Sequence, residues 1–291
     1  MPRKEIPIQI VINDKETGAS VKFEFEDQAV RKFFYGKKVG DIVEGDAFGF
    51  PGYTFQIRGA SDIAGFPHIK GLPGIALRQI LKSGPPGYRP KKYKKEKKTG
   101  GYKIINLKNV KKKKSVRGEE LSEWTRQINM VLLERKGQKI EEMDENSIVN
   151  DKLLSELAKK IGKLALRPGF KVLKVSGGDD LEKYLLENGP GEDFFNKLYL
   201  KVGIYILKLG DKKKEILRFT RDASRKHVDV LSSHVIAKIL EYMEKSKAGE
   251  IDLSSDETIE SITKDVINIF EAHLKGELTK RAKISLKPLE L

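Results

Sequence analysis

The sequence contains no cysteine. This excludes disulfide bonds, zinc ribbons and thiol catalysis, and it fits a reducing compartment. The chain also lacks any apolar run near the ~20 residues that a membrane-spanning helix requires. Its amino terminus, Met1–Glu5, leads into an alternating segment instead of a continuous apolar stretch, so no signal peptide is expected. We therefore expect a soluble, cytoplasmic protein with no membrane partner.

Histidine is scarce, and its spacing does not favour a metal site. The four histidines are His68, His227, His234 and His273. His227 and His234 lie seven residues apart on a predicted helix, whereas a helical zinc site uses histidines four apart with an acidic partner. His273 falls on the apolar side of the last predicted helix. The sequence predicts no bound metal.

Two short motifs resemble parts of active sites. Gly177–Asp180 precedes a predicted helix at 181–187, but it has no lysine and serine or threonine at phosphate-loop spacing. Asp222, Ser224 and His227 lie close together without a glycine-flanked nucleophile elbow. Helix capping is the simpler explanation of both motifs. We predict no catalytic residue, no cofactor and no small-molecule substrate.

The positive charge is confined to one part of the chain. Residues 1–118 hold 26 lysines and arginines against 11 acidic residues, which accounts for the whole net charge of +15. Residues 119–291 hold 31 basic and 31 acidic residues and are neutral. Such an asymmetry favours a polyanionic partner for the first part only.

The charge is densest in residues 82–117, which we call the basic arm. It contains 15 basic residues and one acid, Glu96, so it cannot form a packed core. A solvated arm is one interpretation. Tyr88, Tyr93 and Tyr102 are interleaved with the cations, however, and aromatic rings stack on bases while lysines and arginines contact phosphates. We favour a nucleic-acid-binding arm that is not ordered without RNA, because its own charges repel.

Alternating apolar residues predict several short strands in the first part. A hairpin is expected from Ile6–Ile12 and Val21–Phe25, and a short helix at 28–34. Further strands are expected at 39–43, 53–58, 75–81 and 127–134. Ile104, Ile105 and Leu107 favour an extra strand within the arm. Short strands separated by glycine and proline are typical of a small β-barrel or sandwich.

After a polar linker at 138–147, the pattern predicts a separate α+β domain at 148–291. Helices are expected from Leu153 to about Arg167–Gly169, from Val228 to Tyr242 and from Ile259 to Ile269. The first has Asn150 or Asp151 as a possible cap, and the last has Ser254 and Glu257 at capping-box spacing. Alternation at 198–206 and 216–220 predicts a second hairpin around the turn Gly210–Lys213.

Several motifs in residues 5–137 are similar, in order and spacing, to those of one family. They are Ile10–Gly18, Val39–Asp41, Gly52–Tyr53, Ile57–Asp62, Gly65–Pro67, Gly87–Pro90, Lys114–Gly118 and Gln127–Asn129. The chain resembles the sixth protein of the small ribosomal subunit in its archaeal and eukaryotic form. Residues 138–291 match no family that we can name.

The resemblance implies an all-β small barrel with a basic arm, lying on small-subunit ribosomal RNA beside neighbouring ribosomal proteins, without catalysis. It implies that basic and aromatic residues of the matching loops meet RNA. Together with the lysines of the arm, the predicted RNA-binding residues are Arg58, Lys82, Tyr88, Arg89, Lys91, Lys92, Lys94, Lys95, Lys97, Lys98, Lys111, Lys112, Lys113, Lys114 and Arg117.

The chain also departs from the family pattern. Ala60 replaces a usual glycine, Ile63 and Ala64 replace a charged pair, and His68 replaces a methionine. Glu119 stands where an asparagine is usual, and residues 99–110 resemble an insertion. The role of Trp124, in the core or at the surface, is left open.

Three hypotheses follow. The chain is a structural constituent of the small ribosomal subunit with a lineage-specific extension. Alternatively, it is a ribosome-associated assembly, hibernation or regulatory factor. The third hypothesis, an RNA-directed enzyme with its active site in 148–291, has the least support, since no acid–base set accompanies Asp179 and Asp180.

Overall fold

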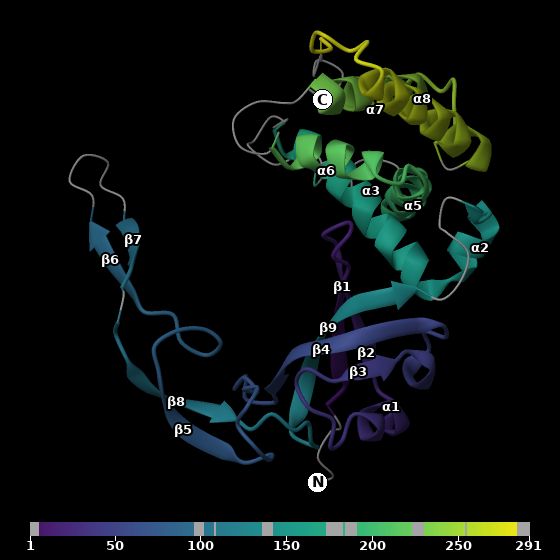
Figure 1. Cartoon of the computed structure of the whole chain (residues 1–291). Coiled ribbons are helices and arrows are strands. Elements are labelled where there is room, and N and C mark those ends of the chain that lie inside the picture. Colours follow the sequence, from purple (N-terminus) through teal and green to yellow (C-terminus); the bar gives the residue numbers. More distant parts are fainter. Residues whose placement is uncertain are drawn as a thin grey trace. The chain divides into compact units, whose positions relative to one another are not determined.

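The computed structural model describes residues 6–95, 102–107, 109–135, 142–172, 183, 191–222, 230–253 and 255–283. The chain divides into two compact units. The sheet unit comprises Met1–Lys15 and Ser20–Gly137, and the helical unit comprises Glu16–Ala19 and Gln138–Leu291. In the described residues the first unit is mainly strands and the second mainly helices (Figure 1).

The main sheet has five strands in the order β2-β1-β9-β4-β3. β1 (Ile8–Asn13) and β2 (Ser20–Phe25) form the predicted hairpin. β9 (Thr125–Arg135) pairs in parallel with β1 and antiparallel with β4 (Tyr53–Asp62). β3 (Ile42–Glu44) pairs with β4 and forms an edge. The sheet is therefore mixed, and a strand near the end of the unit lies at its centre.

The core follows directly from the alternation along these strands. Ile8, Ile10 and Ile12 of β1 are at most 2% exposed, and Ile57 of β4 and Ile128 of β9 are fully buried. Their intervening neighbours lie on the opposite face, because successive side chains of a strand alternate. Burying each such side chain stabilises the unit by ~1.5–3 kcal/mol.

The sheet is open, whereas the sequence predicted a small barrel. Among the described strands, β2 and β3 are the two edges and do not pair with each other. Phenylalanine rings enclose the core instead: the ring centre of Phe23 on β2 lies 4.9 Å from that of Phe50, which lies 6.2 Å from that of Phe55 on β4. β3 has only three residues, so it offers too little backbone for closure. The barrel part of the prediction is not confirmed.

The helix expected after the hairpin is present. α1 (Gln28–Phe33) begins after Asp27, whose carboxylate accepts a hydrogen bond from the Ala29 N–H at 2.8 Å. A short 3-10 helix, η1 (Asp46–Phe48), lies between β3 and β4 and buries Phe48 against Phe50 and Phe55. The Asp27 cap satisfies an N–H group that has no partner within the helix.

The basic arm and the strand that leads into it form two separate ladders. β5 (Leu77–Lys82) pairs with β8 (Lys112–Arg117), and β6 (Lys91–Lys95) pairs with β7 (Tyr102–Asn106). β6 and β7 lie in the connection between β5 and β8, and both ladders are outside the five-stranded sheet (Figure 1). The extra strand predicted around Ile104 is present as β7. The pairing differs from our expectation of an arm without order, because backbone hydrogen bonds align the strands despite their charge.

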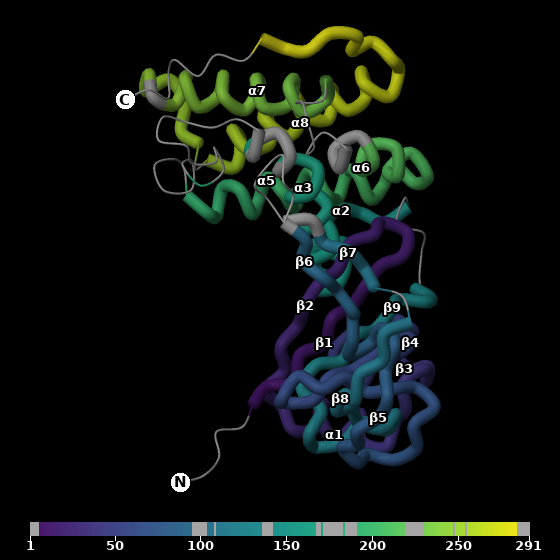
Figure 2. Tube along the Cα trace, turned by 90° about the vertical axis from the view of Figure 1, so that its left-hand side faces the viewer, coloured from purple at the N-terminus to yellow at the C-terminus, as the bar shows by residue number. Residues whose placement is uncertain are grey.

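The prediction of an α+β second domain is wrong in the described residues. They form α2 (Glu145–Asn150), α3 (Lys152–Val172), α5 (Glu192–Lys208), α6 (Lys212–Asp222), α7 (Val230–Lys247) and α8 (Asp256–Leu274). The expected hairpin at 198–206 and 216–220 lies in α5 and α6. More than half of the residues of α5 are buried, so apolar residues occur in every turn of this helix. By chance some of them, at 198–206, also fall at every second position, which is the pattern of a strand. Figure 2 shows α7 and α8 side by side.

The helix ends confirm some predictions and correct others. The Asp151 carboxylate accepts hydrogen bonds from the N–H groups of Leu153 (2.9 Å) and Leu154 (3.0 Å), as expected for a cap. α3 does not end at 167–169 but continues to Val172. The cap of α8 is Ser255, which accepts from the Thr258 N–H, and Ser254 lies outside the described residues. The last three residues of the expected linker at 138–147 belong to α2.

α3 and α5 cross in backbone contact at two glycines. A β-carbon at Gly203 would lie 1.8 Å from the Ala158 carbonyl oxygen, and one at Gly162 would lie 2.0 Å from that of Tyr199. Both separations are far below van der Waals contact. The approach of these two helices therefore depends on the absence of side chains at both positions.

Candidate nucleic-acid interface

The β5–β8 ladder places lysines directly opposite each other. Lys82 faces Lys112, and Ile80 and Leu81 face Lys114 and Lys113. Like charges directly opposite on a ladder are destabilising. Lys112 and Lys113 are exposed, as is Lys111 just before the strand. The ladder thus presents a row of cations that a polyanion would stabilise.

The β6–β7 ladder combines exposed cations with an exposed aromatic ring. Lys91, Lys92 and Lys94 of β6 are exposed. Tyr93 faces Ile104, and the two are 64% and 51% exposed, so the ladder has no apolar cover on that side. Lys95 ends β6, while Lys97 and Lys98 lie outside the described residues. Phosphate and base contacts can therefore be made by adjacent residues of one strand.

The turn between β5 and β6 packs against Pro67 and strand β8. Gly87 has φ 88°, and a β-carbon there would lie 3.0 Å from Cγ of Pro67. The Lys114 ammonium lies 5.6 Å from the centre of the half-buried Tyr88 ring, a cation–π contact. Arg89 is exposed. The turn thus connects the two ladders of the arm and leaves Arg89 accessible.

Arg58 lies outside the arm, on strand β4 of the main sheet. The register of β4 against β9 shifts between Ile57 and Gly59, so Arg58 is the extra residue of a bulge. Its side chain is exposed and donates a hydrogen bond to the Gln56 side chain at 3.3 Å. Arg58 is a further accessible cation of the sheet unit, on a different element from the lysines of the arm.

Arg117, a predicted contact residue, forms an ion pair with a buried carboxylate inside the protein. Its Nε donates to the Asp62 carboxylate at 2.9 Å, and a terminal nitrogen donates to the Ile75 carbonyl at 3.2 Å. The Asp62 side chain is 2% exposed and that of Arg117 is 14% exposed. The guanidinium also lies over the Trp124 ring. Arg117 therefore joins the base of the arm to the sheet.

His68 lies beside this ion pair and was not predicted to have a role. It is 3% exposed; Nδ1 lies 2.8 Å from the Gly118 carbonyl oxygen and Nε2 lies 3.3 Å from the Thr125 hydroxyl. Burial lowers the pKa of His68, and the Arg117 charge lowers it further, while the Gly118 carbonyl and the Asp62 charge oppose the shift. The neutral imidazole therefore links the arm to β9.

We expect the sheet unit to lose stability in mild acid. The lowered pKa means that His68 stabilises the fold fully above its ordinary pKa of 6.5, and that this stability falls as the pH drops from there towards the lowered pKa. The fall is at most ~1.4 kcal/mol per pH unit. Urea unfolding at pH 7.5 and pH 5, followed by the fluorescence of Trp124, measures it.

His68→Gln, which cannot titrate, should reduce this pH dependence, whereas His234→Gln in the helical unit should leave it unchanged. An equal pH dependence in wild type and His68→Gln would contradict the role of His68.

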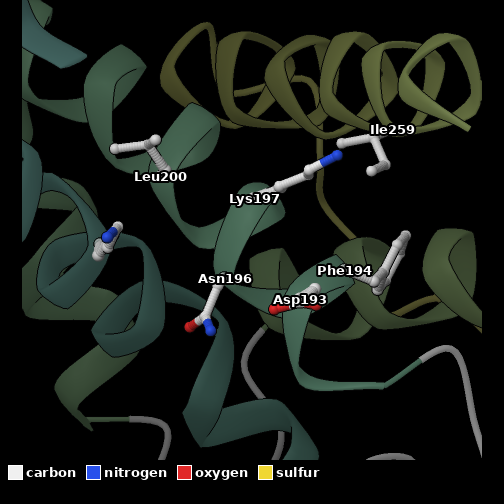
Figure 3. A pocket seen from close by; sticks show the side chains of 7 residues that line it. Asp193, Phe194, Asn196, Lys197, Leu200 and Ile259 are labelled. Carbon is white, nitrogen blue, oxygen red and sulfur yellow. The ribbon is translucent and has the colours of Figure 1, made fainter. Parts of the chain in front are cut away.

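The helical unit contains one surface pocket that bears on the enzyme hypothesis. It measures about 550 Å³ and is lined by residues of α3, α5 and α8, including Lys159, Asp193, Asn196 and Lys197 (Figure 3). The Lys197 ammonium is paired with Asp256 at 2.7 Å, and Asp193 and Asn196 are exposed. Within the described residues these groups form no buried acid–base pair. The pocket does not support catalysis.

The remaining sequence motifs add no site. Within the described residues, no three acidic or histidine side chains are placed to bind a metal. Nε2 of His234 lies 2.9 Å from the Lys280 carbonyl oxygen. Gly177–Asp180, Ser224 and His227 lie outside the described residues, and Asp222 ends α6. Among the described helices, none has the length and apolar character needed to span a membrane.

The sheet unit thus combines an open five-stranded sheet with two separate lysine-rich ladders. The comparisons with known proteins show which class of protein has this unit. Residues 8–145 match the family model described as Ribosomal protein S6e.

Three relatives carry the name small ribosomal subunit protein eS6. The protein of Pyrobaculum arsenaticum is 35% identical over 130 residues, which are 43% of this chain and 77% of the relative. That of Methanoculleus marisnigri is 36% identical over 121 residues, 42% of this chain and 80% of the relative. That of Natronomonas pharaonis is 33% identical over 135 residues, 46% of this chain and 92% of the relative.

The chain belongs to the ribosomal protein S6e family. It is a small-subunit ribosomal protein of archaeal type, a structural component of the translation apparatus on the cytoplasmic ribosome and not an enzyme. The predicted resemblance is thereby confirmed. The family match ends at residue 145, so most of the helical unit lies outside it.

Proposed function

We propose that this protein binds small-subunit ribosomal RNA through the basic arm and Arg58. The observation that carries the proposal is the pair of lysine-rich ladders. Within the described part of the chain, none of their lysines forms an ion pair with a carboxylate, and exposed Lys112 faces Lys82. Their charges are therefore available for phosphates, whose neutralisation releases counterions.

The arrangement of the arm supports recognition of RNA shape more than of RNA sequence. Lysines contact phosphates as point charges and carry no base preference. Tyr93 is exposed between Lys92 and Lys94, so a base stacked on its ring would be flanked by cations. Arg117 contributes indirectly, because its bond to Asp62 fixes the root of β8.

We further propose a division of labour between the domains predicted from the sequence. Residues 1–137 bind RNA, residues 138–147 connect, and residues 148–291 form an extension that contacts neighbouring ribosomal proteins. The neutral charge of residues 119–291 supports a protein partner for the extension. So do the polar pairs between α5 and α8, Lys197–Asp256 (2.7 Å) and Lys201–Glu260 (3.2 Å), which balance its surface charge locally.

The second candidate is a ribosome-associated assembly, hibernation or regulatory factor. Its support is that the family match, at residues 8–145, covers less than half of the chain, so most of the helical unit lies outside it. Both candidates place the sheet unit on ribosomal RNA. They differ in whether the protein is a permanent part of the particle.

Quantitative mass spectrometry of small subunits from the source cells distinguishes the two candidates. We expect one copy per particle after a high-salt wash, because the base stack on Tyr93 and the proposed protein contacts of residues 148–291 do not depend on phosphate neutralisation. A ratio far below one, or release together with known factors, would contradict a stoichiometric role and favour the accessory factor.

A further inference from the structure

Trp124 is the only tryptophan of the chain and lies in the turn between β8 and β9. It is 41% exposed, whereas its neighbours Ser122 and Thr125 are 7% and 2% exposed. A large aromatic side chain at the surface, held by a buried turn, is a feature that packing of the sheet unit does not explain.

The backbone around Trp124 is fixed from three directions. The Arg31 guanidinium donates to the carbonyl oxygens of Glu123 (2.7 Å) and Thr125 (3.3 Å). The Ile63 N–H donates to the Trp124 carbonyl oxygen at 2.9 Å. The Thr125 N–H closes the turn on the Ser122 carbonyl oxygen at 2.9 Å. The indole is thus attached to a rigid support, which lowers the entropy lost when it binds a partner.

A cation lies against this ring and is itself fixed. Cζ of Arg117 lies 5.5 Å from the ring centre of Trp124, a cation–π contact. Asp62 and the Ile75 carbonyl hold the guanidinium in place. The same strand carries Lys112 and Lys113, so the indole sits at the root of the row of exposed lysines.

We propose that the exposed surface of Trp124 stacks on an unpaired nucleobase of the RNA that the basic arm binds. This inference rests on the proposed RNA-binding function and adds a base-contact site outside the arm. Unpaired bases in RNA loops stack on aromatic rings, and a ring that is already fixed and backed by a guanidinium is suited to that contact. The exposed lysines Lys112 and Lys113, on the same strand as Arg117, favour RNA over an apolar protein partner.

Because Trp124 is the only tryptophan, its fluorescence reports on this site without a label. Isolated small-subunit RNA from the source cells should quench or shift the emission as binding saturates, with binding followed separately by filter retention. Inorganic polyphosphate should bind the same lysines but leave the emission nearly unchanged, since it has phosphates and no bases. Saturated RNA binding without any change of emission, or an equal change with polyphosphate, would overturn the inference.

Trp124→Ala should weaken binding of this RNA about 5- to 100-fold, as expected from the loss of one base stack, without changing its salt dependence. Leu133→Ala is the matched control, because Leu133 is 39% exposed and lies near the other end of β9. Equal affinity of Trp124→Ala and wild type would count against the stack. If wild type does not retain the RNA at all, the RNA-binding function itself fails, and the two failures are thereby distinguished.

Discussion

Replacing Lys111, Lys112, Lys113 and Lys114 together by glutamine is expected to reduce the affinity for isolated small-subunit RNA by up to about 1,000-fold at 0.1 M salt. Lys111–Lys113 are exposed and have no carboxylate partner within the described residues, so their charge is free to neutralise phosphates. Each lost phosphate contact should also make the slope of log affinity against log salt shallower by about 0.9. Filter binding at several salt concentrations measures both effects.

The control removes the same number of charges from the helical unit. The exposed residues Lys160, Lys214, Lys264 and Lys275 become glutamine in one variant. This variant should keep the wild-type affinity and nearly the wild-type slope, because these lysines are not part of the basic arm that we propose as the phosphate-binding surface. If both variants lose affinity equally, the effect is one of net charge, and the arm is not the binding surface.

Gly203→Ala should destabilise the helical unit by ~3 kcal/mol or more. At an ordinary helix position the same change stabilises by ~0.5–1 kcal/mol, so the sign of the effect is the test. The new β-carbon would lie 1.8 Å from the Ala158 carbonyl oxygen. This oxygen belongs to the backbone, so the steric clash can be relieved only if α3 and α5 move apart. Gly162→Ala should behave in the same way, through Tyr199.

Denaturant unfolding followed by circular dichroism at 222 nm measures the helical unit, while Trp124 fluorescence follows the sheet unit. Ser261→Ala, on the exposed face of α8, is the control and should change stability by less than ~0.5 kcal/mol. A stabilising effect of Gly203→Ala would mean that α3 and α5 do not cross in backbone contact.

The sequence predicted the elements whose environment is simple. Buried residues alternate with less buried ones along β1 and β2, so Ile8, Ile10 and Phe23 belong to a period-two pattern that gives the hairpin directly. α8 has one buried stripe, including Ile259, Ile262 and Val266, and its period is visible in the same way.

α5 shows why the second unit was misassigned. Its buried residues include Leu198, Tyr199, Val202, Gly203 and Ile204, which surround most of the helix. Between Leu198 and Leu207 only one charged residue, Lys201, interrupts the apolar run, so the period of 3.6 residues is weak in that stretch of the sequence. The chance alternation at 198–206 then resembled a strand, and only the packing of α3 and α8 against α5 decides between the two.

The predicted RNA-contact residues also divide into those that the sequence revealed and those whose surroundings only the structure shows. The lysines of the arm were found from charge alone, since 15 like charges in 36 residues exclude a core whatever the fold. Arg117 was grouped with them by its motif, but Asp62, 55 residues earlier in the sequence, binds its guanidinium. No local pattern could have revealed that ion pair, or the cation–π contact between Arg117 and Trp124.

The sequence by itself determined the family, the non-enzymatic class, the location of the charge and most strands of the sheet unit, because composition and period-two burial are local properties. The tertiary structure alone decided that the sheet is open, that the described part of the second unit is helical, and that Arg117, His68 and Trp124 meet at the root of the arm. These features depend on contacts between residues far apart in the chain, such as β1 with β9 and His68 with Gly118, and such contacts leave no periodic signal in the sequence.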